Sequence, residues 1–87
     1  MAMLYTPDGR TKVVRPSGGK FTNEEVWAML GGYHETVRTI DGERMLVHDE
    51  GRLKGLELNI PATRIYVHGR HDVIVGPALV LEESERF

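Results

Sequence analysis

The stretch SGGKFTNEEVWAMLGG, residues 17–32, carries the clearest helix signals in the chain. Thr22 is a residue type that caps a helix N-terminus, and Glu25 follows it at the spacing of a capping box, in which each side chain bonds the backbone N–H of the other residue. The two glycines that close the stretch are typical of a helix C-terminus, where a left-handed residue is needed. The pattern predicts a helix from about Asn23 to Leu30.

One side of this predicted helix is apolar. Val26, Trp27 and Leu30 lie at positions i, i+1 and i+4, with Met29 beside them, and such spacing gives a stripe that packs on a sheet. Phe21 precedes the cap, where an apolar residue often packs back onto the first turns. The helix is therefore expected to cover one face of a sheet.

Two predicted β-hairpins flank the helix. In MAMLYTPDGRTKVVRP, residues 1–16, the turn is predicted at Thr6-Pro7-Asp8-Gly9, because proline presets φ and glycine accepts a positive φ. In YHETVRTIDGERMLVHDEG, residues 33–51, the Asp41-Gly42 pair is a strong hairpin signal. The apolar residues expected on the inner face of this second hairpin are Tyr33, Val37, Met45 and Val47.

The C-terminal part contains weaker signals. Asn59 fits a helix N-cap and Pro61 a first helical turn, so residues 62–66 form either a short helix or an extended segment. The segment DVIVGPALVL, residues 72–81, is rich in strand-forming residues but broken by Gly76-Pro77, which favours a bulge or an edge strand. The final EESERF, residues 82–87, is expected to be a solvated tail.

These elements predict one α+β domain over residues 1–87. Its small, mainly antiparallel sheet is built from two hairpins and a C-terminal strand. One main helix lies on a face of the sheet. Whether a second short helix forms is a question that the sequence leaves open.

Composition narrows the function classes. The chain has 87 residues, no cysteine and a net charge of −2, with lysine and arginine dispersed along it. Disulfides and thiol chemistry are therefore absent, and no basic stripe favours nucleic acid. No apolar run is long enough to span a membrane, and the first residues lack the pattern of a signal peptide. A cytoplasmic protein is expected.

Several fragments together resemble a known family. They are LYTPDG, FTNEEVWAMLGGYHETV, DGERMLVHDEGRLKGLELNIPAT and VGPALV. They are similar to the short bacterial and bacteriophage proteins grouped as domain of unknown function family 3846, over nearly the whole chain. The resemblance implies an accessory product of phages or mobile elements that works in a bacterial cytoplasm. It supplies no catalytic residues.

Three groups of residues suggest chemistry but have a simpler explanation. The segment from Ser17 to Lys20 before the helix favours an anion, yet its glycine and Ser/Thr positions fail the P-loop pattern. His68 and His71 have ligand chemistry, but glycine between them indicates a turn and no companion completes a metal set. A flexible loop that enters the helix explains the first group, and solvated loop histidines explain the second. The third group is the acids Glu35, Glu43, Asp49 and Glu50, which could be paired carboxylates but are explained by an acid-rich flank of the hairpin. His34 and His48 could meet across the facing strands of this hairpin, and surface positions explain them equally well.

The run GRLKGLELNIPATRIY, residues 51–66, allows two interpretations. In the structural one, Asn59 caps a helix and the hydroxyl of Thr63 bonds one turn back. In the functional one, Asn59, Thr63 and Arg64 line a polar pocket for a base, ribose or phosphate, with Tyr66 able to stack. Glu35 would enter this pocket from the sheet.

These observations favour a noncatalytic binding protein without cofactor or metal. The first hypothesis is a phage accessory protein with an anti-defence role, which sequesters a nucleotide-like signal molecule of the host. The alternatives are a protein inhibitor or adaptor that docks on a host enzyme through its apolar C-terminal strand, and a small nucleotide-processing enzyme. A homo-oligomer is also expected, since that strand leaves an edge best paired or covered.

Overall fold

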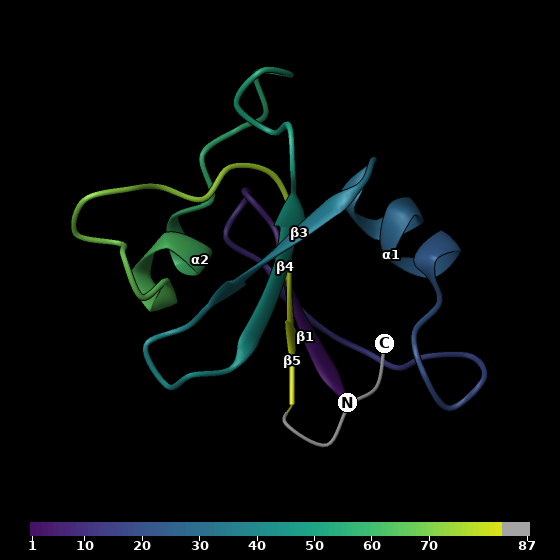
Figure 1. Ribbon diagram of the computed structural model, residues 1–87. Helices are drawn as coiled ribbons and strands as arrows, with labels where there is room; N and C mark the ends of the chain where they lie inside the picture. Colours follow the sequence, from purple (N-terminus) through teal and green to yellow (C-terminus); the bar gives the residue numbers. More distant parts are fainter. Residues whose placement is uncertain (83–87) are drawn as a thin grey trace.

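A five-stranded antiparallel sheet forms the centre of the protein, with strand order β2-β1-β5-β4-β3 (Figure 1). The computed structural model describes residues 1–82. The α+β class is confirmed. The elements in chain order are β1 (Ala2–Tyr5), β2 (Thr11–Val14), α1 (Asn23–Leu30), β3 (His34–Arg38), β4 (Arg44–His48), α2 (Ile60–Ile65) and β5 (Ala78–Leu81).

Both predicted hairpins form. β1 and β2 pair antiparallel around the predicted turn, where the N–H of Thr6 bonds the carbonyl of Arg10 at 2.9 Å. β3 and β4 pair around Asp41 and Gly42, and Gly42 has a φ of 83°. Glycine is needed there because few other residues adopt a positive φ at low cost.

Helix α1 has the predicted bounds and both predicted caps. The Oγ1 of Thr22 accepts from the Glu25 N–H at 3.1 Å, and a Glu25 carboxylate oxygen accepts from the Thr22 N–H at 3.1 Å. Gly31 ends the helix with a φ of 81°. The capping box and the glycine stop are thus confirmed.

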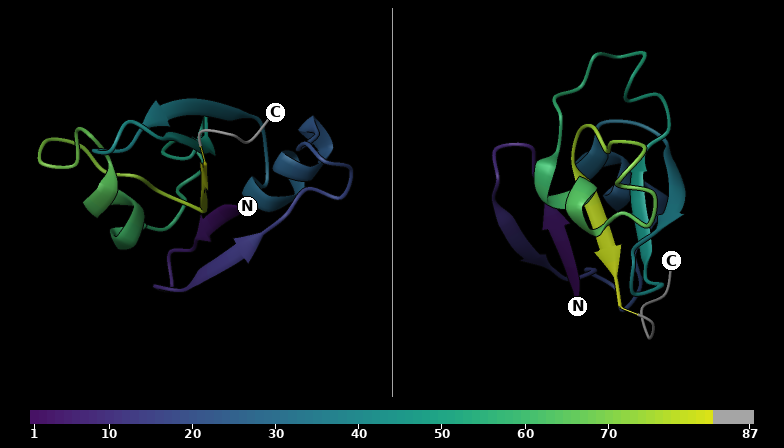
Figure 2. Two further views of the ribbon diagram at one scale, coloured as in Figure 1. Left: turned by 90° about the horizontal axis from the view of Figure 1, so that it is seen from below. Right: turned by 90° about the vertical axis from the view of Figure 1, so that its left-hand side faces the viewer.

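The sheet is covered on both faces, one by α1 and the other by α2 (Figures 1 and 2). Alternate residues of the central strands enter two separate cores. The core under α1 contains Ala2, Phe21, Val26, Leu30, Leu46, Leu79 and Leu81. The core under α2 contains Met45, Val47, Ala62, Ile74, Ala78 and Val80. The second short helix thus exists and supplies the cover of the second face.

Two aromatic residues do not lie where the sequence pattern placed them. Val26 and Leu30 are buried, but Trp27 is 47% exposed, because a residue next to Val26 is rotated about 100° away on the helix surface. Tyr33 precedes β3 and is 70% exposed, so it does not belong to the inner face of the hairpin. The rings of Trp27 and Tyr33 instead contact each other outside the core.

The C-terminal strand is central, and the prediction of an edge strand was wrong. β5 pairs with β1 on one side and β4 on the other, and its four residues are buried. Gly76 and Pro77 precede β5, so the missing N–H of proline costs no ladder hydrogen bond.

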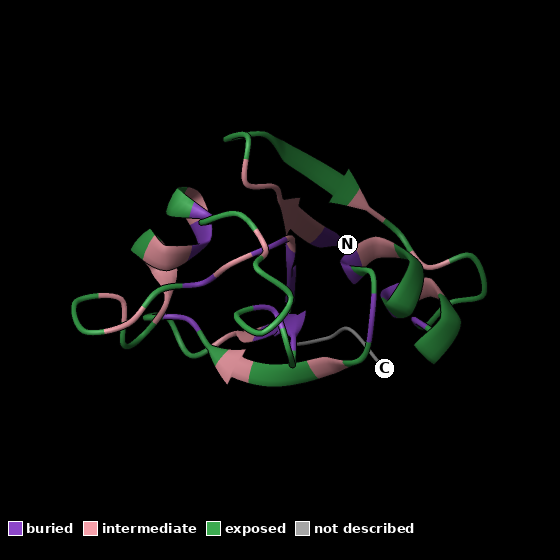
Figure 3. Cartoon of the chain, turned by 90° about the horizontal axis from the view of Figure 1, so that it is seen from above, coloured by how far each residue is buried: buried purple, intermediate pink, exposed green. Residues whose placement is uncertain are grey.

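The two edges of the sheet belong to β2 and β3, which are largely exposed (Figure 3). Residues 72–81 therefore offer no free sheet edge through which the protein could dock on a partner or form an oligomer. The predicted homo-oligomer stays a prediction. Of the predicted solvated tail, residues 83–87 lie outside the described part of the chain.

Candidate functional site

Asn59 is a buried structural residue. Its side-chain oxygen accepts from the Ala62 N–H at 3.0 Å, which caps α2. Its side-chain nitrogen donates to the carbonyls of Tyr5 at 2.9 Å and Gly76 at 2.8 Å. The side chain is fully buried, and these bonds use both of its donor hydrogens. The predicted capping role is confirmed.

Thr63 makes the predicted bond one turn back. Its hydroxyl donates to the Asn59 carbonyl at 2.7 Å and accepts from the Ile74 N–H at 2.9 Å. The same segment is held by a bond from the Asn59 N–H to the Ile74 carbonyl at 2.8 Å. The chain between α2 and β5 is therefore fastened to the start of the helix.

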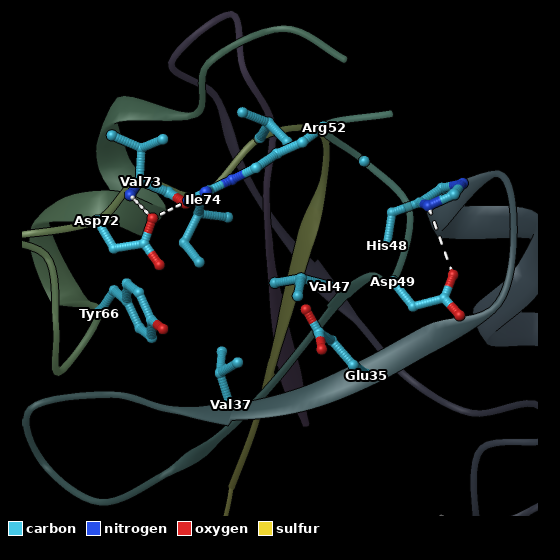
Figure 4. Close-up of a pocket in the computed structure, with 12 residues that line it drawn as sticks. Glu35, Val37, Val47, His48, Asp49, Arg52, Tyr66, Asp72, Val73 and Ile74 are labelled. Carbon is cyan, nitrogen blue, oxygen red and sulfur yellow. Dashed lines mark hydrogen bonds and ion pairs between the residues drawn. The ribbon is translucent and has the colours of Figure 1, made fainter. Parts of the chain in front are cut away.

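Two hollows open on the α2 face of the sheet. The first, called here the polar cavity, has a volume of about 280 Å³ (Figure 4). Its lining residues are Glu35, Val37, Val47, His48, Asp49, Gly51, Arg52, Tyr66, Asp72, Val73, Ile74 and Val75. The second, called the apolar groove, has a volume of about 540 Å³. Its lining residues are Ile40, Leu58, Ile60, Thr63, Arg64, Tyr66, Val67, Gly69, Arg70 and Val73.

The polar cavity carries more negative than positive charge. Glu35, Asp49 and Asp72 bring three carboxylates, and Arg52 brings one guanidinium. Arg52 forms an ion pair with Asp72 and also donates to the Val73 carbonyl at 3.3 Å (Figure 4). Its charge is thus already neutralised, and Glu35 and Asp49 leave the cavity suited to a cation more than to a phosphate.

His48 borders the polar cavity, but its buried ring turns away from the hollow (Figure 4) and lies against Gly32. Its Nδ1 accepts from the Glu50 N–H at 3.0 Å, so this nitrogen carries no proton in the observed arrangement. On the other side, a Cβ added to Gly32 would lie 2.4 Å from the His48 Nε2. The imidazole therefore fills space that only a glycine at position 32 leaves open.

The apolar groove gathers exposed hydrophobic side chains. Its exposed apolar members are Ile40, Leu58, Ile60, Val67 and Val73, each between 42% and 64% exposed. Scattered exposed hydrophobics are normal, but a contiguous group around one hollow indicates a binding surface. The groove lies where the turn after α2 passes close to the helix, since a Cβ on Gly69 would lie 2.1 Å from the Thr63 carbonyl oxygen.

Two arginines, Arg64 and Arg70, border this groove. Within residues 1–82, neither Arg64 nor Arg70 has a side-chain hydrogen bond or an ion pair, and no carboxylate lines the groove. Unpaired guanidinium groups beside an apolar surface are suited to an anion that also carries an apolar body. The apolar groove is the better candidate for the predicted ligand.

The predicted site residues divide between the two hollows. Thr63, Arg64 and Tyr66 lie together in the apolar groove, and Tyr66 lines the polar cavity as well. Glu35 lies in the polar cavity, so it does not enter the same hollow as Arg64. Asn59 lines neither hollow, because its side chain is used inside the protein.

Sequence reasoning missed Arg70, Arg52 and Asp72. Arg70 had only a weak local signal, because Gly69 before it indicates a turn but not which part of the chain that turn approaches. The Arg52–Asp72 pair had none, since the two residues are joined only by the fold.

The anion site and the histidine site considered in the sequence both have simple structural explanations. The Ser17 N–H and hydroxyl donate to the Glu25 carboxylate at 3.1 and 3.3 Å, so a protein carboxylate occupies the position proposed for an anion. These bonds, the Ser17 backbone bond foremost, lower the pKa of Glu25 below its ordinary value. His68 and His71 lie in a turn, and the described residues contain no group of three or more acids and histidines placed to hold a metal ion.

Comparison with known families agrees with the sequence resemblance. The family described as "Domain of unknown function (DUF3846)" matches residues 1–87, the whole chain. The protein belongs to this family. Searches of curated proteins and of solved structures found no significant match. None of the helices described within residues 1–82 is long and apolar enough to cross a membrane.

Proposed function

We propose that this member of the domain of unknown function family 3846 is a noncatalytic binding protein for a nucleotide-like molecule held in the apolar groove. The observation that carries the proposal is the pair of guanidinium groups of Arg64 and Arg70, which have no partner within residues 1–82 and lie beside an exposed apolar surface. A nucleotide combines an anionic phosphate with the flat, weakly polar face of a base. Both halves of such a ligand match this groove.

Each lining residue has a defined role in the proposal. Arg64 and Arg70 bind phosphate oxygens, since the guanidinium fork fits them in a bidentate manner. Tyr66 and the apolar side chains contact the base. Thr63 positions the groove and does not bind, because its hydroxyl already donates to Asn59 and accepts from Ile74.

The polar cavity is a poorer site for the same ligand. A phosphate placed there would meet the carboxylates of Glu35 and Asp49, and the only arginine is paired with Asp72. Repulsion between like charges would weaken binding. This contrast supports the groove as the site of the proposed ligand.

The proposed setting follows the family. The protein acts as a bacteriophage accessory protein in the cytoplasm of a bacterial host, where it captures a nucleotide-like signal and thereby opposes defence. The enzyme alternative has no residue set in its favour, and the docking alternative now concerns the edges at β2 and β3.

The proposal is tested by identifying the captured molecule. The tagged protein is purified from phage-infected bacteria, denatured, and the released small molecules are measured by mass spectrometry. The doubly substituted protein with Arg64→Ala and Arg70→Ala is purified in parallel. We expect a nucleotide in near-stoichiometric amount from the wild type and its loss from the variant. Equal small-molecule content in both preparations contradicts the proposal.

A further inference from the structure

Trp27 and Tyr33 form an exposed pair on the far side of the sheet from the apolar groove. Their ring centroids are 4.6 Å apart and the ring planes meet at 88°. Trp27 is 47% exposed and Tyr33 70% exposed. Two perpendicular rings open to solvent make a corner, called here the aromatic corner, whose faces attract cations.

The backbone around the aromatic corner is tightly determined. Gly31 ends α1 in the left-handed conformation, and Gly32 lies against the buried His48. The Tyr33 carbonyl then accepts from the Asp49 N–H at 3.0 Å, which begins the pairing of the second hairpin. The exposed Tyr33 is therefore held beside Trp27 by glycine and sheet geometry.

The charge at the aromatic corner is negative. A hollow of about 290 Å³ is lined by Asn23, Glu24, Trp27 and Tyr33, so no basic residue from the described part of the chain lines it. Within residues 1–82, the Glu24 carboxylate has no hydrogen-bond or ion-pair partner. Two aromatic faces with one unpaired carboxylate match a guanidinium or ammonium group.

The aromatic corner also lies at an open sheet edge. β3 begins directly after Tyr33 and is an edge strand, and its start lies beside α1 (Figure 2). The backbone groups of Tyr33 and Thr39 bond toward β4, so the alternation of antiparallel pairing turns those of Thr36 outward.

The end of the β3 edge near Arg38 is closed. There the Val67 N–H donates to the Arg38 carbonyl at 3.0 Å, and the Ile40 N–H to the Ile65 carbonyl at 2.8 Å. An extended peptide could pair with the outward backbone groups of Thr36 by strand addition. A side chain of that peptide opposite His34 would lie next to a second hollow of about 200 Å³, which His34 lines together with Asn23, Trp27, Gly32 and Tyr33.

We propose that the aromatic corner binds an arginine or lysine side chain of a partner protein, whose extended segment pairs with the open edge of β3. The occupant follows from charge complementarity with Glu24 and from the outward backbone groups of Thr36. This surface is separate from the apolar groove, so it holds whether or not the groove binds a nucleotide.

The test uses a peptide probe and the intrinsic fluorescence of Trp27, the only tryptophan in the chain. The probe is acetyl-Thr-Val-Arg-Val-Thr-amide, and its control has Gln in place of Arg. We expect saturable changes in Trp27 fluorescence and in the amide NMR signals of residues 34–37. The Gln peptide should bind about fivefold more weakly, the size of a cation–π contact at an exposed site.

Matched variants separate this site from unspecific charge effects. Tyr33→Ala and Glu24→Gln each weaken binding of the Arg peptide at least threefold, whereas Glu57→Gln, an exposed acid outside the aromatic corner, leaves it unchanged. Equal binding of the Arg and Gln peptides overturns the proposal. So does saturation of the fluorescence change by tetramethylammonium with no NMR change along β3, since the ligand would then be a free cation.

Discussion

The hydroxyl of Thr63 on α2 accepts a hydrogen bond from the backbone N–H of Ile74, eleven residues further along the chain, at 2.9 Å. Ile74 is buried in the core under α2, so its N–H has no access to water. A single side chain thus fastens the segment before β5 to the helix beside it. Two neighbouring residues therefore have different roles. Thr63 holds the wall of the groove in place, whereas Arg64 is exposed to solvent, where it can contact a ligand.

Thr63→Val keeps the side-chain shape and removes both hydrogen bonds of the hydroxyl. The unpaired Ile74 N–H should lower the free energy of unfolding by about 1–3 kcal/mol. Urea unfolding followed by circular dichroism measures this change, and Thr63→Ser, which retains a hydroxyl, is the control. Wild-type stability of the valine variant would show that the hydroxyl does not bridge the two segments.

Asn59→Ala removes the cap of α2 and leaves the carbonyls of Tyr5 and Gly76 without their donor. The expected loss of unfolding free energy is about 3 kcal/mol, from the cap and the unsatisfied carbonyls together. Asn59→Asp keeps the capping oxygen but cannot donate, so it should be destabilising as well. A stable Asn59→Asp protein would contradict the assigned hydrogen bonds.

Gly32→Ala places a Cβ where the ring of His48 lies, 2.4 Å from Nε2. The ring must move, so we expect a loss of about 1–3 kcal/mol in the free energy of unfolding. The cause is checked by a double-mutant cycle with His48→Ala, in which the cost of the added methyl should largely disappear. If the free-energy changes of the two substitutions simply add, the clash of the new methyl group lies with another residue than His48.

Glu25 makes the stability depend on pH. The Ser17 backbone bond, with that from Thr22, lowers the pKa of Glu25 below its ordinary value of 4.5. A lowered folded-state pKa means that the stabilisation is present above the unfolded pKa and is lost as the pH falls through the folded one. Thermal melts between pH 6 and about pH 3 should therefore show a smaller acid loss for Glu25→Gln than for the wild type. Parallel curves for the two proteins would rule out this contribution.

Sequence reasoning succeeded where the signal is local. Helix α1 was predicted because Thr22, Glu25 and Gly31 all lie within one segment, and the hairpin at Asp41 and Gly42 joins strands that are neighbours in sequence. The position of β5 was missed because its pairing with β1 joins residues far apart in the chain. Hydrophobic runs show that such a strand is buried, but not which strands lie beside it.

For the candidate site, too, local features could be predicted from the sequence and long-range contacts could not. The capping role of Asn59 was open to prediction because cap and helix are adjacent. The grouping of Arg64 and Arg70 with Ile40 depends on the pairing of residues 38–40 with 65–67, which no local pattern reports. Trp27 was misplaced because an apolar side chain beside a helical stripe has no local mark that distinguishes core from surface.

The central claim, that the apolar groove binds a nucleotide through Arg64 and Arg70, is tested most directly by calorimetric titration with cyclic di-adenylate and with ADP. We predict saturable binding of at least one of these probes by the wild type. The double substitution Arg64→Ala and Arg70→Ala should weaken it at least tenfold, since a hydrogen bond to a charged group contributes about 1.5–3 kcal/mol. The matched control, Lys12→Ala with Arg15→Ala, removes two positive charges on and just after β2 and should bind as the wild type does. Failure of the wild type to bind either probe, or equal affinity of the two double variants, would contradict the account.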